Sequence, residues 1–80
     1  MWIRSQDRKK IIKCEDIEIS GTDIVNITRY GVAKLGKYSI EEKALKVLDM
    51  IEQSVSGFLD EKVAQFYNYG IFQMPTDEEV

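Results

Sequence analysis

Five cationic side chains crowd into ten residues near the start of the chain. They are Arg4, Arg8, Lys9, Lys10 and Lys13. Arginine and lysine bind phosphate groups, and a dense basic cluster is a common electrostatic footprint of nucleic-acid binding. The rings of Trp2, Tyr30 or Tyr38 would then be available to stack on bases. One interpretation is therefore a nucleic-acid contact through this cluster, and the other is a solvated polar turn.

The overall charge argues against a dedicated nucleic-acid domain. The formal net charge is −3 and the sequence pI is about 4.9, whereas such domains are usually basic. The charge is uneven, because residues 1–38 carry a net +3 and residues 39–80 a net −6. This asymmetry fits a nucleic-acid face, an acidic tail, or two halves that attract each other in the fold. Nucleic-acid binding is therefore the alternative function, and a protein interaction is the first.

A protein interface is indicated by the aromatic stretch 66–72. It contains no charged residue and four of the eight aromatic residues of the chain. A small domain cannot bury all of them, and exposed apolar patches often mark protein interfaces. We expect a homodimer with Tyr67, Tyr69 and Phe72 in or near the interface. The alternative is that alternate residues of this stretch cover the sheet and the tyrosines stay half-exposed.

The sequence offers little for catalysis. It has no histidine, one cysteine and no glycine-rich phosphate loop, so the usual general base and zinc ligand are missing. Cys14 is in step with Ile12 along an extended segment, and we expect it to be buried and inert. The acidic residues 77–79 lack the ligand spacing of a calcium loop. We therefore expect a non-catalytic interaction module with no cofactor and no metal.

The first half of the chain has the pattern of short strands. Segments 2–6, 10–14, 17–20, 24–30 and 32–38 are rich in β-branched and aromatic residues or alternate with period two. The apolar positions change parity between Cys14 and Ile17. One continuous strand would not bury both sets on one face, so we expect a turn or bulge at Glu15 and Asp16.

One amphipathic helix is predicted over about residues 40–56. Its apolar stripe comprises Ile40, Ala44, Val47, Leu48, Ile51 and Val55. Ser39 and Glu42 fit a capping box, and Gly57 fits a helix C-cap. Residues 58–69 remain open between a short second helix and a loop. A C-terminal strand is expected over about residues 69–74, followed by an acidic tail at 76–80.

These elements predict one domain, residues 1–80, of the α+β class. We expect an antiparallel sheet of about four or five strands with the helix packed on one face. The apolar segments Trp2–Ile3 and Phe72–Met74 lie near opposite ends of the sequence. Setting these two strands side by side would tie down both ends of the chain.

Three parts of the chain carry a resemblance to a protein family. They are Met1–Asp7, the Leu35–Ser39 segment with Glu42, Ala44, Val47, Leu48 and Ile51 after it, and Phe72–Pro75 with the acidic tail. Together they resemble short uncharacterised proteins of Gram-positive bacteria and their phages or prophages. The resemblance covers roughly half of the chain. It implies a bacterial or phage-borne accessory protein and carries over no catalytic or binding residue.

The compartment is expected to be the cytoplasm. No segment approaches the length of about 20 apolar residues that spans a bilayer, so no membrane association is expected. The opening residues lack the apolar core of a signal peptide, and a single unpaired cysteine fits a reducing environment.

Overall fold

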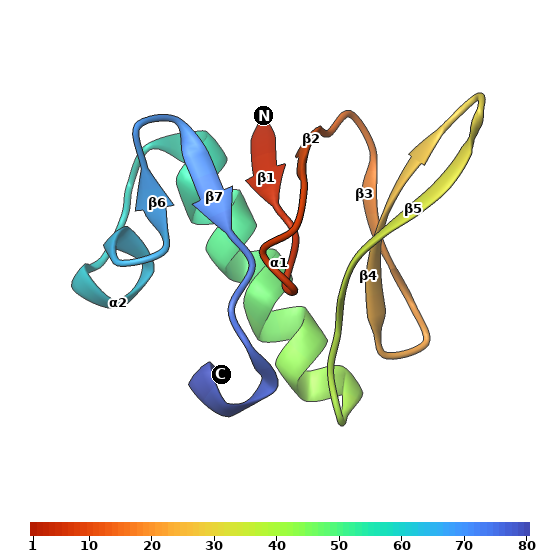
Figure 1. Cartoon of the computed structure of the whole chain (residues 1–80). Helices are drawn as coiled ribbons and strands as arrows, with labels where there is room; N and C mark the ends of the chain where they lie inside the picture. Colours follow the sequence, from red (N-terminus) through yellow and green to blue (C-terminus); the bar gives the residue numbers. More distant parts are fainter.

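A computed structural model describes residues 1–80 as seven strands, two α-helices and one 3-10 helix (Figure 1). The strands are β1 (Trp2–Arg4), β2 (Ile11–Lys13), β3 (Ile17–Ser20), β4 (Asp23–Thr28), β5 (Gly31–Lys37), β6 (Tyr67–Asn68) and β7 (Ile71–Gln73). The helices are α1 (Glu41–Ser56), α2 (Glu61–Ala64) and the 3-10 helix η1 (Asp77–Glu79). The predicted α+β class, main helix and C-terminal strand are confirmed.

The strands are more numerous than expected and form two sheets. Sheet A has the order β2-β1-β7-β6, and sheet B has the order β3-β4-β5. The predicted break at Glu15 and Asp16 separates them. Both backbone N–H groups donate to the Asn26 side-chain oxygen, at 3.0 and 3.3 Å, which holds the bend and turns the chain from sheet A into sheet B.

The first and last strands lie side by side, as expected. β1 pairs in parallel with β7, and the other neighbours in sheet A are antiparallel. The pairing lies in the middle of sheet A, with β2 and β6 at its edges.

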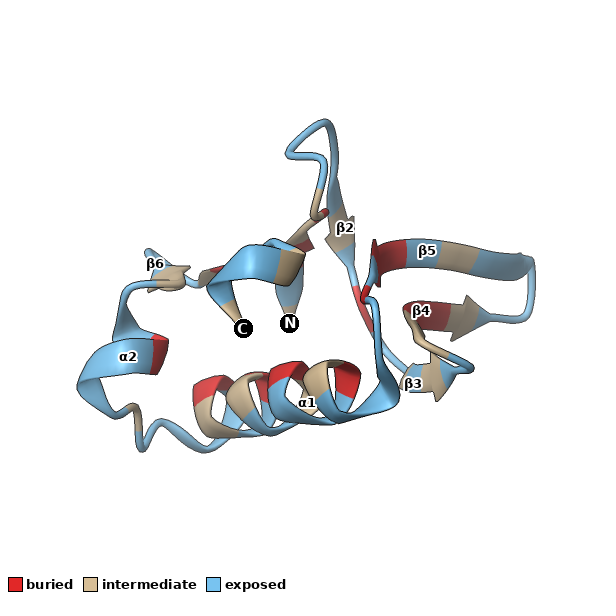
Figure 2. Cartoon of the chain, turned by 90° about the horizontal axis from the view of Figure 1, so that it is seen from below, coloured by how far each residue is buried: buried red, intermediate tan, exposed pale blue.

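Helix α1 packs beneath both sheets and closes one shared core. Its buried positions Ala44, Val47 and Ile51 face the sheets (Figure 2). The same core contains Ile3 and Phe72 from sheet A. The 3.6-residue period of the helix therefore brings one apolar stripe against strands from both ends of the chain.

Two details of the helix prediction are wrong. The N-cap is Ile40 rather than Ser39, and no side chain caps the helix. The Ser39 N–H instead donates to Asp77 Oδ1 at 2.8 Å. The ends of the predicted stripe, Ile40 and Val55, are exposed, because the sheets cover only the middle of the helix. Gly57 is the C-cap as predicted, with a left-handed φ of 84° that favours glycine.

The segment 76–80, expected as an acidic tail, folds back onto the start of α1. Thr76 and Glu79 form a capping box within η1. Lys43 Nζ donates to the Asp77 backbone oxygen at 2.8 Å and pairs with its carboxylate at 3.4 Å. The buried Tyr38 hydroxyl donates to the Pro75 carbonyl at 2.7 Å. These contacts fasten the end of the chain to α1 and to the segment that connects β5 with α1.

The open stretch before β7 contains the short helix α2. Asp60 caps it, accepting a hydrogen bond from the Val63 N–H at 2.9 Å. None of the helices has the length and apolar character needed to cross a bilayer.

Candidate functional site

Side-chain alternation along three short strands creates the outer face of sheet A. Ile3 and Phe72 point inward to the core, so their neighbours on each strand point away from it. The outward residues form two rows, Lys13–Trp2–Ile71 and Ile11–Arg4–Gln73, which follow the strand register. Residues paired across strands lie about 4.5–5.5 Å apart at Cβ, so each row is a continuous surface.

The turn between β1 and β2 presents three more of the predicted cations, Arg8, Lys9 and Lys10. Asp7 organises this turn by accepting hydrogen bonds from the Ser5 hydroxyl at 2.6 Å and the Lys9 N–H at 3.0 Å. These bonds, that of Ser5 first, hold the pKa of Asp7 below its usual 3.8. The turn projects on the side of the sheets opposite α1 (Figure 2).

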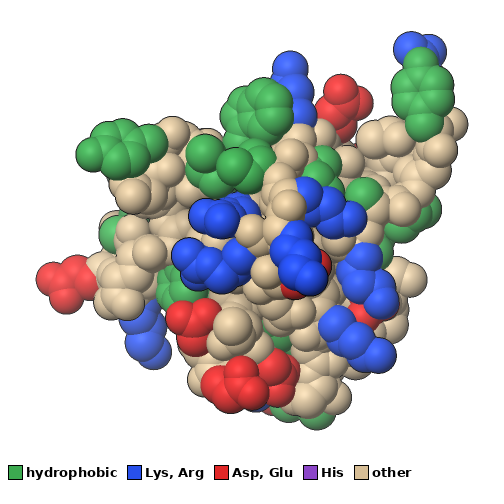
Figure 3. Space-filling view, in the orientation of Figure 1, with side chains coloured by type: hydrophobic (Ala, Val, Ile, Leu, Met, Phe, Trp, Pro, Cys, Tyr) green, Lys and Arg blue, Asp and Glu red, His purple; other side chains and the backbone are tan.

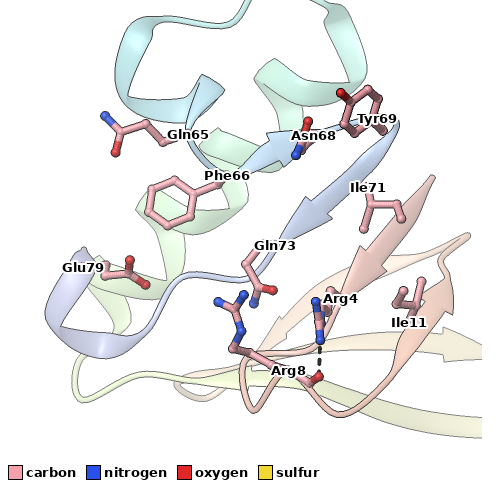
Figure 4. Close-up of a pocket in the computed structure, with 10 residues that line it drawn as sticks. All are labelled: Arg4, Arg8, Ile11, Gln65, Phe66, Asn68, Tyr69, Ile71, Gln73 and Glu79. Atoms are coloured by element: carbon pink, nitrogen blue, oxygen red, sulfur yellow. Dashed lines mark hydrogen bonds between the residues drawn. The ribbon is translucent and has the colours of Figure 1, made fainter.

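Two arginines meet at the base of this turn. Arg4 Nε donates to the Arg8 carbonyl oxygen at 3.1 Å (Figure 4). Neither guanidinium forms an ion pair, since the two ion pairs of the chain join Lys34 to Asp23 and Lys43 to Asp77. No carboxylate lies within ion-pair distance of either guanidinium, so the positive charges of the two arginines add at this point of the surface.

A basin of about 410 Å³ opens beside these arginines (Figure 4). We call it the arginine basin. Its lining residues are Arg4, Arg8, Ile11, Gln65, Phe66, Asn68, Tyr69, Ile71, Gln73 and Glu79. Most of them are exposed or half-buried, so the basin is a surface depression between the β1–β2 and β6–β7 hairpins.

Backbone strain is concentrated at this basin. Arg8 and Tyr69, with φ of 66° and 51°, are the two non-glycine residues of the chain in left-handed conformation, and both line the basin. Tyr69 and Gly70 form the two-residue turn of the β6–β7 hairpin, for which asparagine-glycine is the favoured pair. Such strain costs of the order of 1–3 kcal/mol per residue and clusters at functional sites.

The predicted cationic residues come together on one surface. Arg4 and Arg8 line the basin, Lys13 lies beside Trp2, and Lys9 and Lys10 extend the surface along the turn. In Figure 3, lysine and arginine side chains gather across this face, and acidic side chains lie mainly along its lower edge.

The predicted interface residues do not share one surface. Phe72 is fully buried in the core, with 0% exposure, so it is not at the surface and this part of the prediction is wrong. The reason is its pairing: Phe72 lies next to Ile3 in the register of β1 and β7 and faces α1. Tyr67 is half-buried against the same core. Tyr69 is 97% exposed, at the rim of the basin.

Of the three rings considered for stacking, only Trp2 belongs to the cationic face. It is 48% exposed between Lys13 and Ile71. Tyr38 is buried in the core, and Tyr30 lies in the turn between β4 and β5, far from β1 in Figure 1.

Sequence patterns do not reveal Gln73 or Ile11 as parts of the site, and they mark Phe66 only as part of the aromatic stretch 66–72, not as a neighbour of the cations. Phe66 and Gln73 reach it only because β7 inserts beside β1, a pairing between residues 69 positions apart in the register Trp2–Ile71. The available signal was the period-two alternation of β1 and β7, which assigns Gln73 to the same side of its strand as Ile71.

The described residues include one cysteine and no group of metal-ligating side chains. Cys14 is buried, as expected, and burial raises the pKa of its thiol, which keeps it protonated and unreactive at neutral pH. No three histidine, cysteine or acidic side chains lie close enough together to hold a metal ion.

No protein family matches the chain, and no curated protein or solved structure is significantly similar to it.

Proposed function

We propose that the protein is a non-catalytic accessory module that binds single-stranded nucleic acid on the outer face of sheet A. The observation that carries the proposal is the joining of five cations outside any ion pair with the exposed ring of Trp2 on one surface. Cationic surfaces that follow the phosphate backbone, interleaved with aromatic rings that stack on bases, are the common design of single-strand binding.

The low pI does not oppose this proposal. A bound strand interacts mainly with the charges of the surface that it contacts, and not with the net charge of the whole chain. The outward side of α1 carries the exposed acids Glu41, Glu42, Asp49 and Glu52. This side is opposite the sheets. A strand lying on sheet A would therefore meet the cationic residues, while much of the negative charge faces away.

The resemblance to bacterial and phage proteins supports the accessory role and a cytoplasmic setting. A single buried thiol fits a reducing compartment. Nucleic acid is abundant there, so a module without catalytic residues would act by occupying or protecting exposed strands.

The test is fluorescence anisotropy with a labelled oligodeoxynucleotide of mixed sequence at low salt. Trp2→Ala should weaken binding by about 1–3 kcal/mol, the value of one base–aromatic stacking contact. Tyr30→Ala is the matched control, since Tyr30 is an exposed aromatic on the other hairpin. Equal effects of the two substitutions, or no binding by the unaltered protein, would refute the proposal.

A charge-matched pair tests the cationic surface separately. Lys13→Gln removes a cation beside Trp2, and Lys46→Gln removes an exposed cation from α1. Both change the net charge by the same amount. We expect only Lys13→Gln to weaken binding and to reduce its salt dependence, by about one phosphate contact.

Self-association is the second candidate, and exposed apolar residues favour it. Trp2 and Ile11 are each about half-exposed, and Tyr69 is almost fully exposed. A two-fold dimer through this face would bury them together. Sedimentation equilibrium at micromolar concentration would then give twice the chain mass, and Tyr69→Glu would return the protein to a monomer. A monomeric unaltered protein would remove this candidate.

A further inference from the structure

The arginine basin has the donors for one phosphate group. Arg4 uses its Nε to bind the Arg8 carbonyl, which leaves both of its terminal nitrogens free. Arg8 makes no side-chain hydrogen bond and no ion pair. Two guanidinium groups with free N–H donors recognise phosphate oxygens through short charge-assisted hydrogen bonds. Figure 4 shows the Arg8 guanidinium extending toward Gln73.

Gln73 supplies a fixed hydrogen-bond acceptor on the same basin. Its amide nitrogen donates to the Ser5 carbonyl at 3.1 Å and to the Met74 carbonyl at 2.8 Å. Because both partners are carbonyl oxygens, the side chain cannot flip its amide. Its oxygen accepts no hydrogen bond within the chain, so it is a preset acceptor for an N–H of a ligand.

The rest of the basin is suited to a flat, apolar group. Phe66 and Ile71 contribute half-buried hydrophobic surface. The volume of about 410 Å³ falls in the range of about 300–1,000 Å³ that is usual for small-molecule sites. The basin therefore offers N–H donors for a phosphate group, an oxygen that can accept from an N–H of a base, and an apolar wall for the base itself. This combination suits a nucleotide.

Glu79 limits the number of phosphates. Its carboxylate lines the basin but accepts a hydrogen bond from the Thr76 N–H at 2.8 Å instead of pairing with either arginine. Because each added phosphate brings further negative charge into a basin that already holds this carboxylate, a polyphosphate is disfavoured more than a single phosphate. The site therefore favours a single phosphate, as in a nucleoside monophosphate or one unit of a strand.

We propose that the arginine basin seats one nucleotide of the bound strand. The phosphate lies between Arg4 and Arg8, and the base lies against Phe66 with one of its N–H groups on the Gln73 oxygen. This inference rests on the proposed function and adds a defined subsite to it.

The left-handed backbone conformation of Arg8 suggests which substitution best tests its guanidinium group. Asparagine tolerates the left-handed conformation better than arginine, so Arg8→Asn removes the guanidinium without adding strain. Lys9→Asn is the control, because it makes the same charge change one residue along the turn and does not line the basin. Thermal melting of both variants would check that each remains folded.

The experiment is an NMR titration of the protein with AMP, with adenosine and with inorganic phosphate. AMP should shift the resonances of the Gln73 amide group and the Phe66 ring, and should bind at least about tenfold more tightly than adenosine or phosphate. Arg8→Asn should weaken AMP binding about tenfold, and Lys9→Asn should leave it within about twofold.

The inference and the proposed function fail differently. If oligonucleotides bind but AMP shifts no basin resonance, the nucleotide seat is wrong and strand binding stands. Equal binding of AMP and phosphate, or equal effects of Arg8→Asn and Lys9→Asn, would also overturn the seat. If neither AMP nor oligonucleotides bind, both fail.

Discussion

Asp77 fixes the position of the C-terminal turn through its charge. The Ser39 N–H bond is the largest cause that lowers the pKa of Asp77 below its usual 3.8, and Lys43 adds to it. A carboxyl whose pKa is lowered by folding stabilises the native state above its unfolded pKa. That stabilisation disappears as the pH falls from about 3.8 through the lower folded value.

Asp77→Asn should therefore lower the melting temperature at neutral pH, because the charge on Lys43 loses its partner. The difference from the unaltered protein should shrink as the pH falls below 3.8 and vanish once Asp77 is protonated in both states. Melting curves followed by circular dichroism across this range provide the measurement. Glu78→Gln is the control, since Glu78 is exposed and makes no hydrogen bond or ion pair. A constant difference at all pH values would contradict this account of Asp77.

At the residue scale, chemistry-bearing side chains were easier to predict than their partners. The five cations are evident in the sequence, and they do share one surface. The placement of Ser39 as a cap failed because a competing acceptor, Asp77, arrives from 38 residues away. A local capping pattern carries no information about such a distant partner.

Helix α1 illustrates what periodicity predicts at the scale of an element. The predicted limits of about 40–56 agree with Glu41–Ser56. The predicted apolar stripe is longer than the buried one, because periodicity does not reveal how much of a helix the sheets cover. Ile51 is 4% exposed, whereas Val55, one turn later on the same predicted stripe, is 69% exposed.

Alanine substitutions at Ile51 and Val55 should differ strongly in their effect on the free energy of unfolding. Ile51→Ala should cost about 2–5 kcal/mol of unfolding free energy, through lost burial and the cavity left behind. Val55→Ala should change it by no more than about 0.5 kcal/mol. Urea denaturation would measure both. Similar costs at the two positions would mean that the helix is covered over its whole length.

The strands were predictable, and so was the adjacency of the first and last ones, but the division into two sheets and the parallel direction of β1 and β7 were not. Period-two alternation and the parity change at Glu15–Asp16 mark the strands and the bend between β2 and β3. Local patterns do not specify a parallel contact between β1 and β7, because such contacts depend on the whole chain closing. The basin lies at that contact, which is why its cations were foreseen and its Gln73 and Phe66 were not.

At the scale of the whole molecule, charge is sorted by face. The sequence suggested two halves of opposite sign. In the fold, lysine and arginine side chains gather on the sheet face (Figure 3), and the exposed positions of α1 include Glu41, Glu42, Asp49 and Glu52. Each phosphate contact with a single strand contributes about −0.7 to the slope of log affinity against log salt.

Binding through all five cations should therefore give a slope of about −3.5, and binding through Arg4 and Arg8 alone about −1.4. Anisotropy titrations at several salt concentrations would distinguish these values. A slope near zero would show that phosphates are not contacted, and would favour self-association as the role of this face.

The parallel contact of β1 with β7 has a consequence for how the protein is made. A ribosome delivers Arg4 and Arg8 more than 60 residues before Gln73. The meander β3–β4–β5 can therefore form during synthesis before β7 is available to pair with β1. A chain interrupted before residue 71 would lack β7, so the β1–β2 hairpin would carry the cations with no neighbouring strand beside β1. Ile3 would then be exposed to solvent, and proteases would cleave such a chain more readily. Nascent or broken chains would thus display positive charge without the basin, which forms only when the two distant segments meet.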